Sequence, residues 1–190
     1  MPERCPWIGN DPLYQHYHDH EWGVPIRERR PLFELLCLEG QQAGLAWITV
    51  LNKREHYRQR FFDFQPEKVA ALSDMAIEQR LTDAGLIRNK LKLYAIRNNA
   101  HALLNMEQQD ISFVDFIWQF SDDAQQQNYW QSMDDVPTSN DASHSLSIAL
   151  KQQGFSFVGN TICYAFMQAA GLINDHLVSC YRHKQCQQPR

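Results

Sequence analysis

The chain has 190 residues, of which 44% are hydrophobic and 21% are charged, and this composition excludes disordered, low-complexity and collagen-like classes. Its length fits one compact domain, or a core with one small lobe. The formal net charge of −4 argues against a simple electrostatic DNA binder, because lysine and arginine supply most non-specific affinity for phosphates.

Helix signals outnumber strand signals along the chain, and we therefore expect an all-α protein. Pro31 at a first-turn position, followed by the apolar run 32–41, predicts a buried helix. Ser73 can cap a short helix that Gly85 stops. Apolar residues at helical spacing over 91–106 predict a longer helix in the centre of the chain.

The second half of the chain continues this pattern. Residues 111–120 predict an aromatic-rich helix, and the polar, acidic segment 121–139 predicts an exposed connection. Ser139 or Asn140 can cap the helix that follows, and Gly154 suits the left-handed position at the end of that helix.

The segment GFSFVGN (154–160) lies between two predicted helices, the second of which opens at Thr161 and closes at Gly171. Gly154 and Gly159 tolerate positive φ and close backbone approach, so the turn could present amide groups to a phosphate beside a helix N-terminus. A packing turn or a short edge strand is the alternative, and this pattern alone favours the alternative.

Charge is distributed unevenly along the chain. Residues 53–97 hold ten basic and six acidic side chains, whereas residues 107–135 hold seven acidic and no basic ones. One face could therefore bind phosphates, although ordinary solvated helices account for the pattern equally well.

The first twelve residues have no apolar signal segment, and no stretch approaches the roughly 18 apolar residues of a membrane span. We expect a soluble, cytoplasmic monomer with no membrane partner.

A candidate metal site involves the two ends of the chain. The five cysteines are odd in number and scattered, which favours metal ligands or reduced thiols over disulfides. His176 and Cys180 would share one face if the local chain is helical, and Cys5 and His18 would complete a Cys₂His₂ set typical of structural zinc. A buried Cys180 with a surface His176 is the alternative without metal. Competing ligands are His16, His20 and Cys186.

Aromatic side chains gather around one acidic position in the first fifty residues. Glu39 lies in the apolar run LLCLEGQQAGLAW, where an ionised carboxylate is costly unless it is paired. It is either paired internally, which the sequence slightly favours, or free for a ligand. With a free carboxylate, the aromatic planes would suit a flat cationic heterocycle such as a methylated purine, whereas an ordinary aromatic core is an equal alternative. The aromatic residues are Trp7, Tyr14, Tyr17, Trp22, Phe33 and Trp47.

Four blocks of the sequence resemble the 3-methyladenine DNA glycosylase I family. They are YHDHEWGVP (17–25), LFELLCLEGQQAGLAWITVL (32–51), DAGLIRNK (83–90) and GFSFVGNTICYAFMQAAGLINDH (154–176). These blocks occur in the family's order and extend over nearly the whole chain. The resemblance implies an all-α helix–hairpin–helix glycosylase fold in a single domain, residues 1–190, with the hairpin at 154–160 on double-stranded alkylated DNA.

The resemblance also implies roles for individual residues. Glu39 would contact the flipped base and is the first candidate for catalysis. The rest of the base pocket would be Tyr14, Tyr17, Trp22 and Trp47. The DNA-binding residues would be Gln42, Gly44 and Leu45 at the gap in the duplex, and Gly154, Phe157, Gly159, Asn160 and Thr161 in the hairpin. One structural Zn²⁺ per chain would join the N- and C-terminal segments through Cys5, His18, His176 and Cys180.

The implied reaction is hydrolysis of the N-glycosidic bond of flipped-out 3-methyladenine, which releases the free base and leaves an abasic site. Methylation at N3 makes the base cationic, so it leaves with little acid catalysis. Asp175 lies at the offset of the superfamily's catalytic Asp but adjoins His176, and Glu39 therefore ranks first. The alternatives are a metallohydrolase, which a complete Cys₂His₂ set disfavours, and a non-enzymatic zinc-containing nucleic-acid-binding module.

Overall fold

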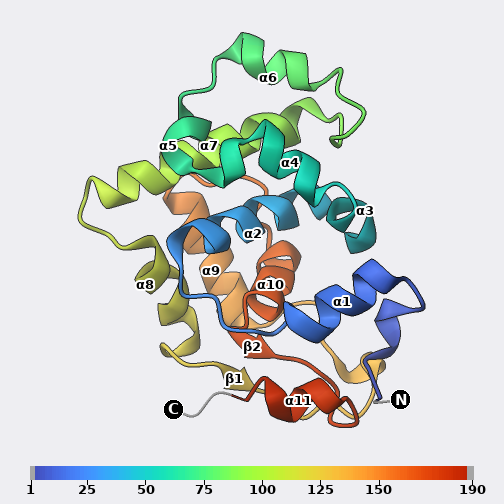
Figure 1. Cartoon of the computed structure of the whole chain (residues 1–190). Helices are drawn as coiled ribbons and strands as arrows, with labels where there is room; N and C mark the ends of the chain where they lie inside the picture. Colours follow the sequence, from blue (N-terminus) through green and yellow to red (C-terminus); the bar gives the residue numbers. More distant parts are fainter. Residues whose placement is uncertain (1–2, 188–190) are drawn as a thin grey trace.

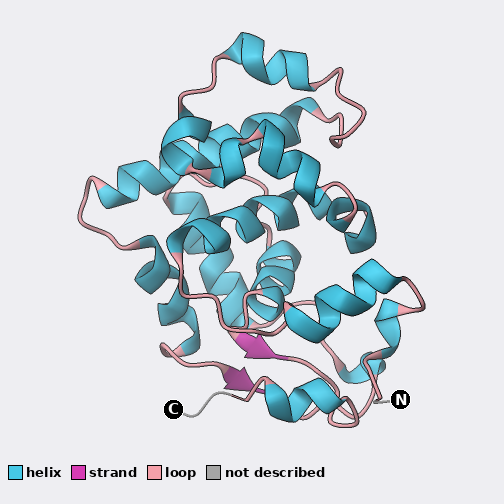
Figure 2. Cartoon of the chain, viewed as in Figure 1, coloured by secondary structure: helices cyan, strands magenta, loops and turns pink. Residues whose placement is uncertain are grey.

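The computed structural model describes residues 3–187, and helices make up most of this part of the chain (Figures 1 and 2). The first helices are α1 (Pro12–His20), α2 (Arg29–Gln42), α3 (Trp47–Leu51), α4 (Arg54–Arg60), α5 (Pro66–Ala70), α6 (Asp74–Arg80) and α7 (Lys90–Glu107). The later helices are α8 (Phe113–Trp118), α9 (Asp141–Gln152), α10 (Asn160–Ala169) and α11 (Tyr181–Gln185). Short 3₁₀ turns are η1 (Pro6–Ile8), η2 (Phe62–Phe64), η3 (Gln119–Ser121) and η4 (Met133–Asp135). The prediction of a mostly helical protein is confirmed.

The main hydrophobic core surrounds α2, which lies in the middle of the molecule in Figure 1. Helices α7 and α10 and the turn η2 pack directly against α2, whereas α5 packs on α7, α4 on η2 and α9 on α10. A second, smaller cluster brings the two ends of the chain together, as Figure 1 also shows. Its buried members are Cys5, Tyr17, Trp22, Leu51, Ala169, Leu177 and Cys180. None of the helices among residues 3–187 is long and apolar enough to cross a membrane.

Local capping signals set several helix ends as predicted. The Ser73 hydroxyl accepts a hydrogen bond from the Ala76 amide (3.2 Å) at the start of α6, and the Asn140 side chain accepts one from Ser143 (2.7 Å) at the start of α9. Gly154 follows α9 with a φ of +91°, a conformation that glycine adopts without steric cost.

The turn between α9 and α10 differs from the prediction in two details. Helix α10 begins at Asn160 with Gly159 as its N-cap, so Thr161 lies inside the first turn and does not open the helix. Gly159 has a φ of −65°, whereas Phe157 adopts a φ of 57°. The left-handed positions of this hairpin are therefore Gly154 and Phe157.

The segment 121–139 is more than an exposed connection, and that prediction is wrong in part. Strand β1 (Gln126–Gln127) pairs in parallel with β2 (Ile173–Asn174), and Figure 2 shows these two short arrows in the lower part of the molecule, near α11. The Val178 amide donates to the carbonyl oxygen of Trp130 (3.1 Å) just beyond the strands. The segment is thus fixed to the C-terminal part of the chain.

Candidate functional site

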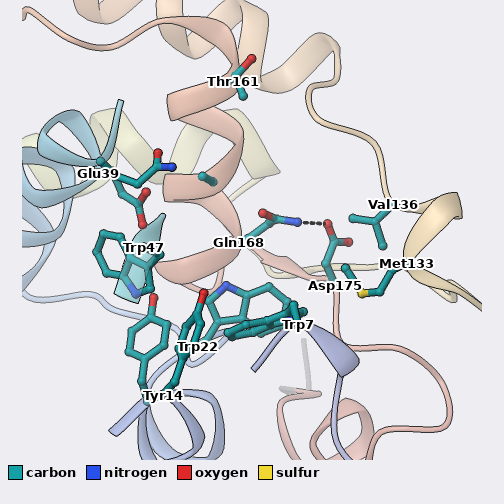
Figure 3. A pocket seen from close by; sticks show the side chains of 13 residues that line it. Trp7, Tyr14, Trp22, Glu39, Trp47, Met133, Val136, Thr161, Gln168 and Asp175 are labelled. Carbon is teal, nitrogen blue, oxygen red and sulfur yellow. Dashed lines mark hydrogen bonds between the residues drawn. The ribbon is translucent and has the colours of Figure 1, made fainter. Parts of the chain in front are cut away.

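A cavity of about 300 Å³ opens between α1, α2, α10 and the segment after β1 (Figure 3). All five residues predicted for the base pocket line it, namely Tyr14, Tyr17, Trp22, Glu39 and Trp47. The volume lies at the lower end of the range for small-molecule sites. Aromatic rings from the first fifty residues therefore surround the Glu39 carboxyl group, and residues of the second half of the chain complete the wall.

Glu39 occupies a buried turn of α2 and is only 4% exposed. No hydrogen bond or opposite charge from residues 3–187 reaches its carboxyl group, and burial alone raises its pKa to about 8. The expected internal pairing is therefore wrong. Sequence could not reveal this, because the same apolar neighbours surround a paired carboxylate and one that faces a cavity. At neutral pH the free protein keeps the Glu39 proton.

The aromatic rings of the cavity stand at angles to one another. The ring centroids of Tyr17 and Trp47 are 5.6 Å apart at 43°, and those of Trp7 and Trp22 are 5.1 Å apart at 69°. The pKa of Tyr17 is raised by burial and, to a smaller extent, by the Glu39 charge. The buried Trp47 Nε1–H donor has no acceptor among the described residues. A buried donor without an acceptor is costly, so it is available to a ligand.

Asp175 is a second carboxylate in the cavity wall, and its surroundings are the opposite of those of Glu39. One of its oxygens accepts hydrogen bonds from Asn128 Nδ2 and Trp130 Nε1, both at 2.7 Å. The other accepts from the Tyr164 hydroxyl (2.6 Å) and from Gln168 Nε2 (2.8 Å, dashed in Figure 3). Four donors hold this carboxylate in place, and through it the segment after β1 is joined to α10.

Part of this cavity wall was not predicted from the sequence. Trp7, which belonged to the predicted aromatic group but was given no role in the pocket, also lines the cavity. The additional lining residues are Met133, Val136, Ala165 and Gln168, together with Gln42 and Thr161, which were expected only at the DNA. Thr161, Ala165 and Gln168 follow one another at helical spacing, and this signal could have predicted an α10 face toward a cavity. Met133 and Val136 are isolated apolar residues in a polar segment, and only the tertiary structure shows what they cover.

The four predicted metal ligands converge where the chain ends meet. Cys5, His18, His176 and Cys180 are buried, and their ligand atoms all lie within 4.8 Å of one another. The Cys180 sulfur is 3.5 Å from His18 Nε2 and 3.6 Å from His176 Nδ1, and the Cys5 sulfur is 3.7 Å from His176 Nδ1. A tetrahedral zinc with Zn–S bonds of about 2.3 Å and Zn–N bonds of about 2.0–2.1 Å separates S from N by about 3.6 Å. The cluster therefore fits a tetrahedral metal ion.

The nitrogen of each histidine that points away from the cluster is also engaged. His18 Nδ1 lies 2.9 Å from Asp19 Oδ1, and three contacts of 2.8–3.0 Å from Arg4 fix the Asp19 carboxylate. His176 Nε2 lies 3.1 Å from the carbonyl oxygen of Trp22. Such outer partners orient imidazole rings in metal sites.

The structure decides two points about the cluster that the sequence left open. Residues 175–180 are not helical, so His176 and Cys180 meet through the loop after β2 and not through helical spacing. His176 is completely buried, which contradicts the alternative of a surface histidine. Among the competing ligands, His16 and His20 pack against each other with ring centroids 4.5 Å apart, and Cys186 is buried outside the group.

Two loops predicted to meet DNA flank α2 and α10. Helix α2 ends at Gln42, and Gly44 follows with a φ of +77°. Leu45 is 38% exposed. At the α9–α10 hairpin, a Cβ on Gly40 would come within 3.1 Å of the Phe157 Cβ. The glycine at position 40 thus lets α2 pack closely against the hairpin.

The fold and the site define a helical protein with a cavity in which aromatic walls surround an unpaired carboxyl group, an arrangement suited to a flat heterocycle. The sequence profile described as methyladenine glycosylase matches residues 7–183. The chain belongs to the methyladenine glycosylase family.

Relatives of this chain support that assignment along most of its length. It is 55% identical over 178 residues to the DNA-3-methyladenine glycosylase 1 of Escherichia coli strain K12, covering 94% of this chain and 95% of the relative. A crystal structure of a 3-methyladenine DNA glycosylase I is similar with a TM-score of 0.93 and 54% identity, covering 94% of this chain and 98% of that one. A variant of such an enzyme in complex with 3-methyladenine has a TM-score of 0.90 and 39% identity, covering 94% and 96%.

Proposed function

We propose that this protein is a DNA-3-methyladenine glycosylase. It hydrolyses the N-glycosidic bond of 3-methyladenine flipped out of alkylated double-stranded DNA, releases the free base and leaves an abasic site. The observation that carries the proposal is the buried, unpaired Glu39 inside an aromatic cavity, in a chain whose relatives carry this enzyme name.

The Glu39 carboxyl group gives the cavity its preference for a damaged base. Its raised pKa keeps it neutral in the free protein, and a cationic base brings the charge that favours the carboxylate. Adenine is neutral at this pH and offers no such compensation. Binding is therefore strongest for the alkylated nucleotide, which must be unstacked at a cost of only a few kcal/mol.

The leaving base needs little further help. Its positive charge is lost when the glycosidic bond breaks, so the protein mainly has to hold the base and admit water to the sugar. No lysine is among the described residues that line the cavity, which supports hydrolysis without strand cleavage. Both Asp175 oxygens are occupied by donors, so we assign Asp175 to positioning and keep Glu39 as the candidate catalytic residue.

The two loops beside the cavity are the proposed DNA contacts. Gln42, Gly44 and Leu45 would enter the gap left by the flipped nucleotide, since the apolar Leu45 is exposed at the end of α2. The hairpin of the helix–hairpin–helix fold would bind phosphates through Gly154, Phe157, Gly159, Asn160 and Thr161. Thr161 also borders the cavity and would lie between the two contacts.

Zn²⁺ is the metal that best suits the Cys₂His₂ group, because closed sites of this composition are typical structural zinc sites. Cys5, His18, His176 and Cys180 would hold one ion per chain and tie the N-terminal to the C-terminal segment. Four protein ligands leave no open position for water, which disfavours a metallohydrolase.

We propose a single glycosylase domain that acts as a monomer in the cytoplasm.

The proposal is tested by measuring 3-methyladenine released from alkylated DNA. The wild type should release it, Glu39→Gln should release much less, and the exposed control Glu55→Gln should match the wild type. Absence of release by wild-type protein would refute the enzyme and favour the binding-module alternative. Undiminished release by Glu39→Gln would remove Glu39 from the essential role and leave the family assignment intact.

A further inference from the structure

Lys92 is a buried lysine to which the proposed reaction gives no role. It lies in the first turn of α7 and is 6% exposed. Its ammonium group donates hydrogen bonds to the carbonyl oxygens of Gln41 (2.8 Å) and Ala43 (2.6 Å) at the end of α2. The last carbonyls of a helix have no partner within the helix, and a cation there is favourable. Lys92 thus caps α2 from a neighbouring helix.

The contact between the two helices is reciprocal. Gln41 Nε2 donates to the carbonyl oxygen of Lys92 (2.9 Å), and the Tyr57 hydroxyl donates to Gln41 Oε1 (3.0 Å). The Ile87 amide in turn donates to the Tyr57 hydroxyl (3.0 Å). This buried network fixes the end of α2 to the α7 side of the core.

The chain leaves this network directly into the exposed loop that carries Leu45. The loop has few bonds of its own: the Leu45 amide donates to the Gln42 carbonyl oxygen (2.7 Å), and Gln42 Nε2 donates to the Leu45 carbonyl oxygen (2.5 Å). The Ala43 carbonyl at its base is held by Lys92. Without that donor, the position of the loop depends on contacts within the loop itself.

The Lys92 charge has no acidic partner among residues 3–187, and desolvation alone lowers its pKa. Its burial is therefore compensated by the two carbonyl groups and not by an ion pair. Lys92 is also absent from the described lining of the base cavity. Lys92 bonds only to main-chain carbonyl groups at the end of α2, and of residues 42–45 only Gln42 lines the cavity, so loss of Lys92 should act chiefly on the exposed part of the loop.

We propose that Lys92 is a positioning residue that holds the 42–45 loop in the shape that enters the DNA gap. This inference rests on the proposed function, because it assigns the loop to DNA. A protein that must order a loop on binding loses conformational entropy, and this loss lowers its affinity. A loop that is already ordered in the free protein avoids this loss. Lys92 therefore acts on duplex binding and leaves base binding unchanged.

The test compares Lys92→Met with Lys90→Met in the full chain. Methionine keeps most of the buried aliphatic length of Lys92 and removes its donors, whereas Lys90 is exposed on the same helix and pairs with Glu78 at the surface (2.6 Å). Two dissociation constants are measured for each protein, one for free 3-methyladenine and one for a duplex with a tetrahydrofuran abasic site. The second probe presents the gap without the base.

For Lys92→Met we expect the Kd of the abasic duplex to rise by about tenfold or more, as for a loop that must be ordered on binding, with the Kd of the free base within about twofold of wild type. Lys90→Met should change neither constant. A duplex Kd that is unchanged in folded Lys92→Met overturns the inference, and so does a parallel loss of base and duplex binding.

If Lys92→Met does not fold, Lys92→Gln is measured instead; its amide ends short of the position of the lysine ammonium group and cannot make both bonds, so the duplex Kd should again rise with the Kd of the free base within about twofold of wild type. Base release by the wild type is measured separately. If no base is released, the proposed function fails, whereas the role of Lys92 is decided by the two dissociation constants.

Discussion

Replacement of Glu39 by glutamine should change how the stability of the protein depends on pH. In the folded chain the pKa of Glu39 is about 8 because the carboxyl group is buried, against 4.5 for an ordinary glutamate. The pKa of Glu39 is higher in the folded chain than in the unfolded chain, so protonated Glu39 contributes its full stabilisation below about pH 4.5. As the pH rises above this value, the unfolded chain loses the proton first, and the stabilisation is lost until the pH passes the pKa of the folded chain, about 8. The loss amounts to about 3 kcal/mol at pH 7 and approaches about 5 kcal/mol above pH 8.

Urea unfolding of wild type and Glu39→Gln between pH 4 and 9 measures this effect. Glutamine is neutral at every pH, so the difference between the two free energies of unfolding isolates Glu39 from all other titrating groups. The free energy of unfolding of the variant should increase relative to that of the wild type from pH 5 to pH 8, and the difference should then remain constant. Parallel curves would refute the reasoning, because they would mean that Glu39 has the same pKa in both states.

Three further outcomes follow from the site. At pH 7 the binding of a 3,9-dialkylated adeninium cation should release about 0.9 proton from Glu39. Calorimetry in buffers of different ionisation enthalpy measures this proton release, which should be absent in Glu39→Gln. Cys180→Ser should lose stoichiometric zinc in metal analysis and unfold at lower urea, whereas Cys186→Ser should retain zinc; the reverse result would exchange the two cysteines as ligands. Trp47→Phe keeps an aromatic plane but removes the unpaired N–H, and should weaken binding of free 3-methyladenine by at least about fivefold; unchanged affinity would show that this N–H makes no bond to the base.

Three helix ends were predictable because their causes are local, whereas α6 already ends at Arg80, before Gly85, and α10 begins at Asn160, before Thr161. Ser73 and Asn140 each accept a hydrogen bond from an amide three residues ahead, and Gly154 provides a positive φ where α9 stops. These interactions are contained within a few residues of sequence. These capping interactions can therefore be predicted from the local sequence alone.

The parts that were not predictable depend on residues far apart in the sequence. The pairing of β1 with β2 joins Gln126 to Ile173, and nothing in the polar sequence 121–139 signals that partner. The missing partner of Glu39 and the convergence of His176 with Cys5 also depend on residues that are far apart in the sequence. Residue types alone left His16, His18 and His20 equal as ligands, and only the family resemblance distinguished His18 before the structure placed it in the cluster.

The order in which the chain is made has a consequence for the cavity. Glu39 is synthesised early, but Thr161, Gln168 and Asp175, which close the cavity on the other side, follow more than a hundred residues later. Domains begin to form while synthesis continues, so a nascent chain exposes the aromatic wall without its cover. The cavity around Glu39 is therefore complete only once the C-terminal segment has returned to the N-terminal helices, and an unfinished chain lacks an enclosed site.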